Sequence, residues 1–148
     1  MVAIRWISIT LMLFANTCFL YAKTIEADFS VEFGIVGEVG RAHAVLTVDG
    51  SHYMIEANVT ALGIAKAVTD NLKERHISKG HVAGDLLVTD MYQMIKRYGI
   101  YTSTTIYRVD HRKKKLTRQY KEWKYDRLTT DRTDTLEYYS KDDMLTLF

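Results

Sequence analysis

Apolar and polar residues alternate strictly along residues 28–35, which places every second side chain on the same face. A period of two residues is typical of a strand with one buried face. This stretch leads to Gly37-Glu38, which is compatible with a two-residue turn, and the next arm ends at Asp49-Gly50. Asp-Gly is a strong hairpin signal, because both central residues of such a turn need positive φ. The pattern therefore predicts three antiparallel strands between residues 28 and 59.

Two-residue turns would fix the pairing of these strands, because the cross-strand partners then follow by counting. The expected rows on one face are entirely apolar: Phe33–Ala42–Ala57, Val31–Ala44–Ile55, Phe29–Leu46–Tyr53 and Ile35–Gly40–Val59. The middle strand carries the smallest side chains, those of Gly40, Ala42 and Ala44. This face is therefore expected to form a trough that could admit a helix or a ligand close to the backbone.

A helix is the first candidate to fill the trough, because small and aliphatic residues recur at helical spacing in residues 61–72, with Thr60 as a candidate N-cap. Strands rich in β-branched and aromatic residues are expected at 90–98, 101–110 and 116–125. The predicted fold is mainly β. It is a curved antiparallel meander, open or half-closed like a barrel, with a short Ala-rich helix packed on it.

The end of the chain predicts a second helix. Ser140 with Asp143 three residues later resembles an N-cap, and an apolar run follows from Met144 to Phe148. An apolar helix without a C-terminal cap suggests a truncated sequence or a helix completed by a partner, and we favour truncation.

The N-terminus has the pattern of a secretory signal peptide, with Arg5, a hydrophobic run and a cleavage site after Ala22. This divides the chain into a signal peptide at 1–22 and a single β-rich domain at 23–148. Two alternatives remain open: an uncleaved membrane anchor, and a lipoprotein signal on Cys18. Cleavage after Ala22 would remove Cys18, the only cysteine, so the mature chain could form no intrachain disulfide.

Composition supports a folded domain, since 47% of the 148 residues are hydrophobic. The formal net charge of +2 selects no class of partner. Basic residues gather instead between Arg108 and Arg127, around a run of four, with aromatic residues such as Trp123 among them. This mixture could contact anionic lipid headgroups or an envelope polymer, whereas an exported protein is not expected to meet nucleic acid. The alternative is a hairpin whose lysines keep a strand edge from aggregating.

The exported N-terminus, the alternating strand with its Gly-rich first hairpin, the Ala/Leu/Gly helix and the terminal YYSKDDMLTLF segment together resemble the bacterial domain of unknown function 3108 family. The resemblance covers residues 29–148 and depends on pattern and order. It implies an exported, antiparallel β protein of the Gram-negative cell envelope. The family carries no established catalytic residues, so the resemblance assigns none here.

Motifs that would carry catalysis are absent from the sequence, which has no Gly-x-Ser-x-Gly, no Ser-x-x-Lys, no Gly-rich phosphate loop and no His-Glu-x-x-His. His43 is expected between Glu32 and Glu56 on the polar face, where it could accept a proton or bind a metal. A solvated charge ladder is the simpler interpretation. His76 and His81 have no recognisable zinc spacing. We therefore assign no catalytic residue, no metal site and no cofactor.

The expected function is that of a non-enzymatic, periplasmic domain of the cell envelope with a binding or structural role. The alternative is a carrier of a hydrophobic or lipid-like ligand, and a hydrolase is a more distant one. Expected partners are lipid or an anionic envelope polymer and not nucleic acid, with membrane contact through the signal segment before cleavage. The candidate ligand-binding residues are Gly40, Ala42, Ala44, Arg112, Lys113, Lys114, Lys115 and Trp123.

Overall fold

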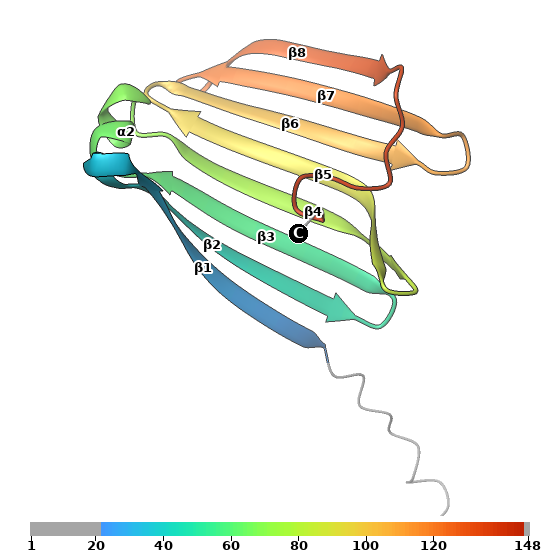
Figure 1. Ribbon diagram of the computed structural model, residues 1–148. Helices are drawn as coiled ribbons and strands as arrows, with labels where there is room; N and C mark the ends of the chain where they lie inside the picture. The colour runs from blue at the N-terminus through green and yellow to red at the C-terminus, as the bar shows by residue number, and fades with distance from the viewer. Residues whose placement is uncertain (1–21, 147–148) are drawn as a thin grey trace, which may run out of the picture.

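The computed structural model describes residues 22–146, which form one antiparallel sheet of eight strands in chain order (Figure 1). The strands are β1 (Lys23–Phe33), β2 (Gly37–Asp49), β3 (His52–Ala61), β4 (Lys73–Ala83), β5 (Leu86–Tyr98), β6 (Tyr101–Asp110), β7 (Lys115–Lys124) and β8 (Arg127–Leu136). Each strand pairs with the next, and in the described part of the chain β1 and β8 do not pair with each other. The predicted fold class, an open meander with a short helix, is confirmed.

Two short helical segments interrupt the meander, η1 (Gly34–Val36) and α2 (Gly63–Val68). The helix predicted over 61–72 is therefore shorter than expected. It begins after Leu62 and not after Thr60, because Thr60 still pairs with β4 as part of β3. Across residues 22–146, no helix has the length and apolar content needed to cross a bilayer.

The first three strands pair in a register that differs from the predicted one. A 3-10 turn connects β1 to β2 in place of the expected two-residue turn. The β2–β3 connection is a two-residue turn, but it uses Gly50 and Ser51, one residue later than the expected Asp49-Gly50, because Asp49 pairs with His52. The observed rows are Ile25–Leu46–Ile55, Ala27–Ala44–Ala57, Phe29–Ala42–Val59 and Val31–Gly40–Ala61. Phe33 consequently lies opposite Gly37 and not opposite Ala42. Up to Val31 in β1, and between β2 and β3, the pairing shifts by an even number of positions, so these side chains keep their predicted faces. A β-bulge between Val31 and Glu32 makes the shift odd at Phe33.

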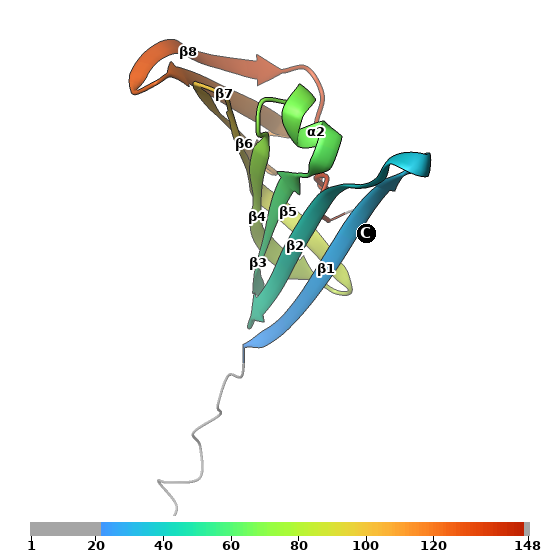
Figure 2. The ribbon, with the colours of Figure 1, turned by 90° about the vertical axis from the view of Figure 1, so that its left-hand side faces the viewer.

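One face of the sheet is covered by α2 and by residues 137–146, which follow β8, and we call it the inner face (Figure 2). A row across this face runs through Ala27, Ala44, Ala57, His76, Met94, Thr105, Tyr120 and Arg132. The backbone N–H of Thr89 donates to the Lys141 carbonyl at 2.9 Å, which ties the C-terminal segment to β5. The buried apolar side chains are those of Tyr53, Ile55, Ala57, Val88, Tyr92 and Leu116.

The prediction of a helix after Lys141 is wrong over residues 141–146, which form turns. The Asp143 carboxylate accepts hydrogen bonds from the backbone N–H of Leu145 at 2.7 Å and of Thr146 at 3.2 Å. Such local side-chain bonds offer the backbone an alternative to helical pairing. Residues 147–148 and the predicted signal peptide, apart from Ala22, lie outside the described residues.

Candidate functional site

Four chain connections meet at one end of the sheet, the end that carries η1 and α2 (Figure 1). Backbone hydrogen bonds join the last three connections, Gly99 N–H to Asp70 O at 2.7 Å and Tyr125 N–H to Ile100 O at 2.7 Å, and Leu62 N–H donates to Val39 O of β2 at 2.9 Å. We call this end of the sheet the helix end. It comprises residues 33–38, 62–72, 98–101 and 124–128.

Large apolar side chains are exposed throughout the helix end. They are Phe33, Ile35, Val36, Ile64, Val68, Ile100, Tyr125 and Leu128. Within the described part of the chain, this end of the sheet holds eight of the fifteen exposed large hydrophobic residues. They are spread over connections that run from the β1–β2 edge to the β7–β8 edge. Such a concentration at one end points to an interaction site, because isolated exposed residues are normal but accumulations are not.

Basic residues lie in or beside the same four connections. The exposed ones are Lys66, Lys73, Arg97, Lys124 and Arg127. Acidic residues are fewer here: Asp70 and Asp126 are exposed, and Glu38 is paired with Arg41 at 2.9 Å. The exposed surface of the helix end is therefore mainly apolar and carries a small excess of positive charge.

The predicted basic residues lie at the opposite end of the sheet. Arg112, Lys113 and Lys114 are exposed in the turn between β6 and β7, and Lys115 opens β7. A hydrogen bond from the Lys113 backbone N–H lowers the pKa of the Asp110 carboxyl, which anchors this turn.

Trp123 does not belong with the basic turn. It lies eight residues after Lys115 on β7, which corresponds to about 27 Å at a rise of about 3.4 Å per residue. The structure places Trp123 next to the helix end instead.

The small residues of β2 lie where the sequence predicted them, on the inner face between β1 and β3. Gly40 is buried, and Ala42 and Ala44 are half-buried. Beside them, Phe29 and Val31 on β1 are 55% and 50% exposed. We call this region the apolar strip. Since β2 and β6 are four strands apart, or about 19 Å at about 4.8 Å per strand, the structure does not bring the strip and the basic turn together.

A pocket of about 330 Å³ lies between the C-terminal segment and the inner face of β5–β7. Its lining is mostly apolar and aromatic: Tyr92, Met94, Tyr107, Val109, Leu116, Tyr138 and Met144, with Thr89, Ser140, Asp142 and Asp143 as polar members. None of the predicted ligand-binding residues lines this pocket.

A buried chain of polar groups borders the pocket. With the imidazole proton on Nε2, His76 donates to Glu74 at 2.8 Å and accepts at Nδ1 from the Tyr92 hydroxyl at 2.6 Å. The order carboxylate, imidazole, hydroxyl is that of a nucleophilic triad. Burial, however, raises the pKa of the Tyr92 hydroxyl far above its ordinary value and so disfavours the phenolate. These contacts satisfy buried polar groups and do not activate Tyr92.

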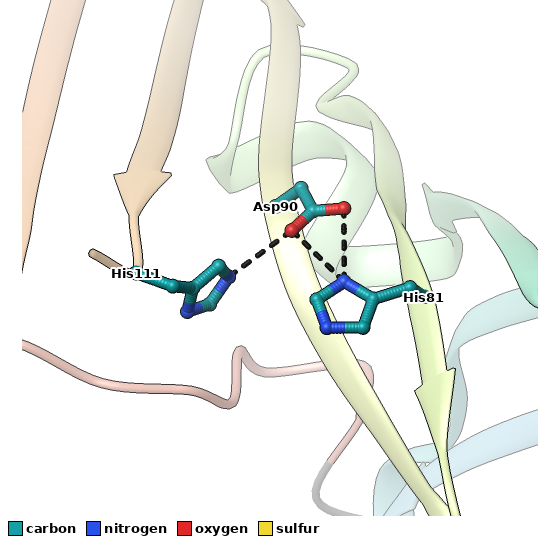
Figure 3. Close-up of side chains that lie close together, drawn as sticks. All are labelled: His81, Asp90 and His111. Atoms are coloured by element: carbon teal, nitrogen blue, oxygen red, sulfur yellow. Dashed lines mark hydrogen bonds and ion pairs between the residues drawn. The ribbon is translucent and has the colours of Figure 1, made fainter.

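Three titratable side chains converge near the basic turn, from three separate parts of the chain (Figure 3). Asp90 Oδ1 lies 3.1 Å from His81 Nδ1 and 3.1 Å from His111 Nε2. A β-bulge pairs Thr89 and Met91 with neighbouring residues of β4 and leaves Asp90 without a cross-strand partner there. Sequence reasoning missed this cluster, because neither the bulge nor the return of the β6–β7 turn to β5 has a local signature.

His43 lies on the predicted polar face, but its predicted partners are wrong. Its Nδ1 lies 2.8 Å from Asp28 Oδ1, and its partner on β3 is Asn58. Glu32 and Glu56 lie elsewhere, because the register of both hairpins is shifted.

Comparison with known proteins identified no relative of this chain. No protein-family model matches the chain, and no curated protein or solved structure is similar to it. The resemblance to the domain of unknown function 3108 family therefore stays a prediction.

Proposed function

We propose that this chain is a non-enzymatic binding protein of the bacterial periplasm that docks on a lipid membrane through its helix end. The observation that carries the proposal is the set of exposed apolar side chains on the four connections at this end of the sheet, three of which are joined by backbone hydrogen bonds. The location follows from the signal-peptide pattern of residues 1–22.

A membrane fits the chemistry of this surface better than a polar partner does. Protein segments that bind at the membrane interface combine apolar side chains, which enter the boundary of headgroups and acyl chains, with basic side chains that contact anionic phosphate. In sequence, Lys66 lies between the exposed Ile64 and Val68 of α2, which share one side of the helix while Lys66 lies on the other. In the β7–β8 connection, Lys124 and Arg127 flank the exposed Tyr125.

Apolar insertion is expected to supply most of the affinity. Full burial of one large aliphatic or aromatic side chain contributes about 1.5–3 kcal/mol, whereas one basic residue near an anionic surface contributes about 1 kcal/mol. The acidic Asp70 and Asp126 offset part of the positive charge. Binding should therefore persist on neutral lipid and strengthen only modestly on anionic lipid.

Vesicle co-sedimentation of the exported, processed chain tests the proposal. We expect binding to phosphatidylcholine vesicles and a modest gain with phosphatidylglycerol. The double variant Ile64→Asp/Val68→Asp should bind at least tenfold more weakly, because both side chains are exposed and have little role in packing. Leu86→Asp is the matched control, since Leu86 is 68% exposed at the opposite end of the sheet. Equal loss in both variants, or no binding of the unmodified chain, would contradict membrane docking.

A specific observation also favours a lipid-like cargo. The apolar strip is open along β1, and with Leu46 it extends over seven residues of β2, from Gly40 to Leu46, or about 20 Å for six steps of about 3.4 Å. Half the hydrocarbon core of a bilayer is about 15 Å, so one acyl chain fits along the strip. A carrier docked by the helix end would load such a chain directly from the membrane.

Lipid extraction and mass spectrometry of the exported protein test the cargo. Phe29→Asp should reduce the retained lipid, because Phe29 stands on the inner face over the strip. Ser30→Asp is the control, since Ser30 is exposed and points to the other face. Lipid retained equally by both variants would assign the strip another role.

A further inference from the structure

We infer that His81, Asp90 and His111 form a binding site for a divalent transition-metal ion, best matched by Zn²⁺. One ligand atom from each residue lies within 4.8 Å of the other two. The site is independent of membrane docking, because it lies at the end of the sheet opposite the helix end.

The spacing of the ligand atoms suits a small cation. In a tetrahedral zinc site with bonds of about 2.0–2.1 Å, neighbouring ligand atoms are about 3.3 Å apart. Asp90 Oδ1 lies 3.1 Å from His81 Nδ1 and 3.1 Å from His111 Nε2. The three side chains point toward one another in Figure 3, with the Asp90 carboxylate between the two imidazole rings.

The donor set selects the class of metal. Two imidazole nitrogens with one carboxylate oxygen suit Zn²⁺ and its neighbours Co²⁺, Ni²⁺ and Fe²⁺. Mg²⁺ and Ca²⁺ prefer ligand sets made of oxygen. Zn²⁺ should therefore bind where Mg²⁺ does not.

The site is accessible and has room for a further ligand. The side chains of His81 and Asp90 are 41% and 48% exposed, and that of His111 is 25% exposed. Asp90 has no cross-strand partner on β4, so it can adjust toward an ion without breaking backbone hydrogen bonds between β4 and β5. Three protein ligands leave a fourth position for water or an anion, as in open zinc sites. The exposed Arg112 and Lys113 nearby make an anionic fourth ligand favourable.

Tyr139 orients one of the ligands. Its hydroxyl oxygen lies 2.8 Å from His111 Nδ1, while Nε2 lies 2.9 Å from the Thr89 carbonyl oxygen and 3.1 Å from Asp90 Oδ1. Both of these oxygens accept, so Nε2 carries a proton in the metal-free chain. Metal binding would leave the ring proton on Nδ1, which then donates to the Tyr139 oxygen, as the second ring N–H of metal-binding histidines usually does. Tyr139 belongs to the C-terminal segment, so a bound ion would join β4, β5 and the β6–β7 turn to this segment.

Metal titration of the untagged full chain, freed of metal by a chelator, tests the site. We expect one equivalent of CoCl₂ to give the absorption bands of tetrahedral Co²⁺ and ZnCl₂ to displace it, while MgCl₂ has no effect. His81→Ala, Asp90→Asn and His111→Ala should each weaken binding at least tenfold. His43→Ala is the matched control, because His43 also contacts a carboxylate, Asp28 at 2.8 Å, but without a second histidine.

A measurement on the unsubstituted chain keeps the inference testable if His111→Ala fails to fold. The ring-nitrogen NMR signals of His81 and His111 should shift on addition of ZnCl₂, and those of His43 and His52 should not. Absence of binding, binding that survives both His81→Ala and Asp90→Asn, or shifts confined to His43 or His52 would overturn the site.

Discussion

The inner face has an open half, on β1 and β2, and a polar half, on β4 and β5. In both halves the usual relation between polarity and burial is reversed. On β1 the side chains of Phe29 and Val31 are apolar, yet they are 55% and 50% exposed. On β4 and β5 the side chains of Ser78 and Thr89 are polar, yet they are 0% and 2% exposed. The difference lies in what covers each half. The C-terminal segment crosses β5, whereas α2 contacts mainly β2 and β3 and leaves the β1 side chains Phe29 and Val31 half exposed.

Burial of the polar half is possible because its hydroxyl groups satisfy one another. The Tyr53 hydroxyl lies 2.9 Å from Ser78 Oγ and 3.1 Å from Thr89 Oγ1, and Thr89 also donates to the Asp143 carboxylate at 3.1 Å. A buried polar group costs little free energy when it has a partner and much when it lacks one. The open half has apolar surface without cover, and this leaves it available for a ligand.

The two halves are expected to differ most in how much stability a glycine-to-alanine substitution costs. At Gly80 a Cβ atom would collide with the Val88 carbonyl oxygen and lie 2.8 Å from Tyr53 Cε1. Gly80→Ala should therefore lower the free energy of unfolding by about 3 kcal/mol. Gly40→Ala is the counterpart in the open half, where the new Cβ would lie 3.5 Å from the Thr60 carbonyl oxygen, an ordinary contact. Urea unfolding measures both, and similar losses would refute the contrast.

High pH should destabilise the polar half selectively. Burial raises the pKa of the Tyr92 hydroxyl well above its ordinary value, which is about 10. The unfolded chain then releases this proton before the folded one, so the stabilisation is complete below about pH 10 and is lost as pH rises further. The loss should reach about 1 kcal/mol at pH 11 for this group.

Urea unfolding of the unsubstituted chain and of Tyr92→Phe between pH 8 and 11 would measure this dependence. The variant should be less stable at pH 8 but should lose less stability on going to high pH. An identical pH dependence in the two proteins would exclude Tyr92 as its source.

Removal of one buried hydroxyl should have a smaller effect. Tyr53→Phe leaves Ser78 without its tyrosine partner and should cost about 1–1.5 kcal/mol. Thermal unfolding with circular dichroism would detect this change. Tyr125→Phe is the control, because Tyr125 is 70% exposed. A neutral Tyr53→Phe would mean that solvent reaches the inner face of β4.

The smallest effect is expected at the open half. Phe29→Ser should change the free energy of unfolding by less than about 0.5 kcal/mol, since the side chain is already half exposed. The same denaturation experiment serves as the measurement. A loss of 2 kcal/mol or more would show that Phe29 packs in a covered core.

The sequence predicted which face of the sheet a side chain occupies better than it predicted which residues pair across neighbouring strands. The alternation places the side chains of residues 28–31 and of β2 and β3 on their observed faces, and the strand at 101–110 has its predicted bounds. The register of the first hairpin was wrong because Gly34–Val36 form a 3-10 turn, which no local signal distinguishes from a two-residue turn. The register of the second was wrong because its two-residue turn uses Gly50 and Ser51 instead of Asp49 and Gly50.

Other features depend on contacts between distant residues. β8 was missed because its Thr, Asp and Arg residues give no apolar period, and this edge strand depends on β7 for its pairing. The helix end exists only once all strands are in place, since its connections come from residues 33 to 128. The histidine cluster likewise depends on the bulge that frees Asp90.

The hydrogen bond between Thr89 and Asp143 spans 54 residues, whereas each strand of the meander pairs with its immediate successor. Contacts close in sequence form quickly, and closing a long loop is slower because more chain entropy is lost. The hairpins are therefore expected to assemble first, with Ser78 and Thr89 still hydrated. Water leaves these hydroxyl groups in the final step of folding, when the last residues return across the sheet.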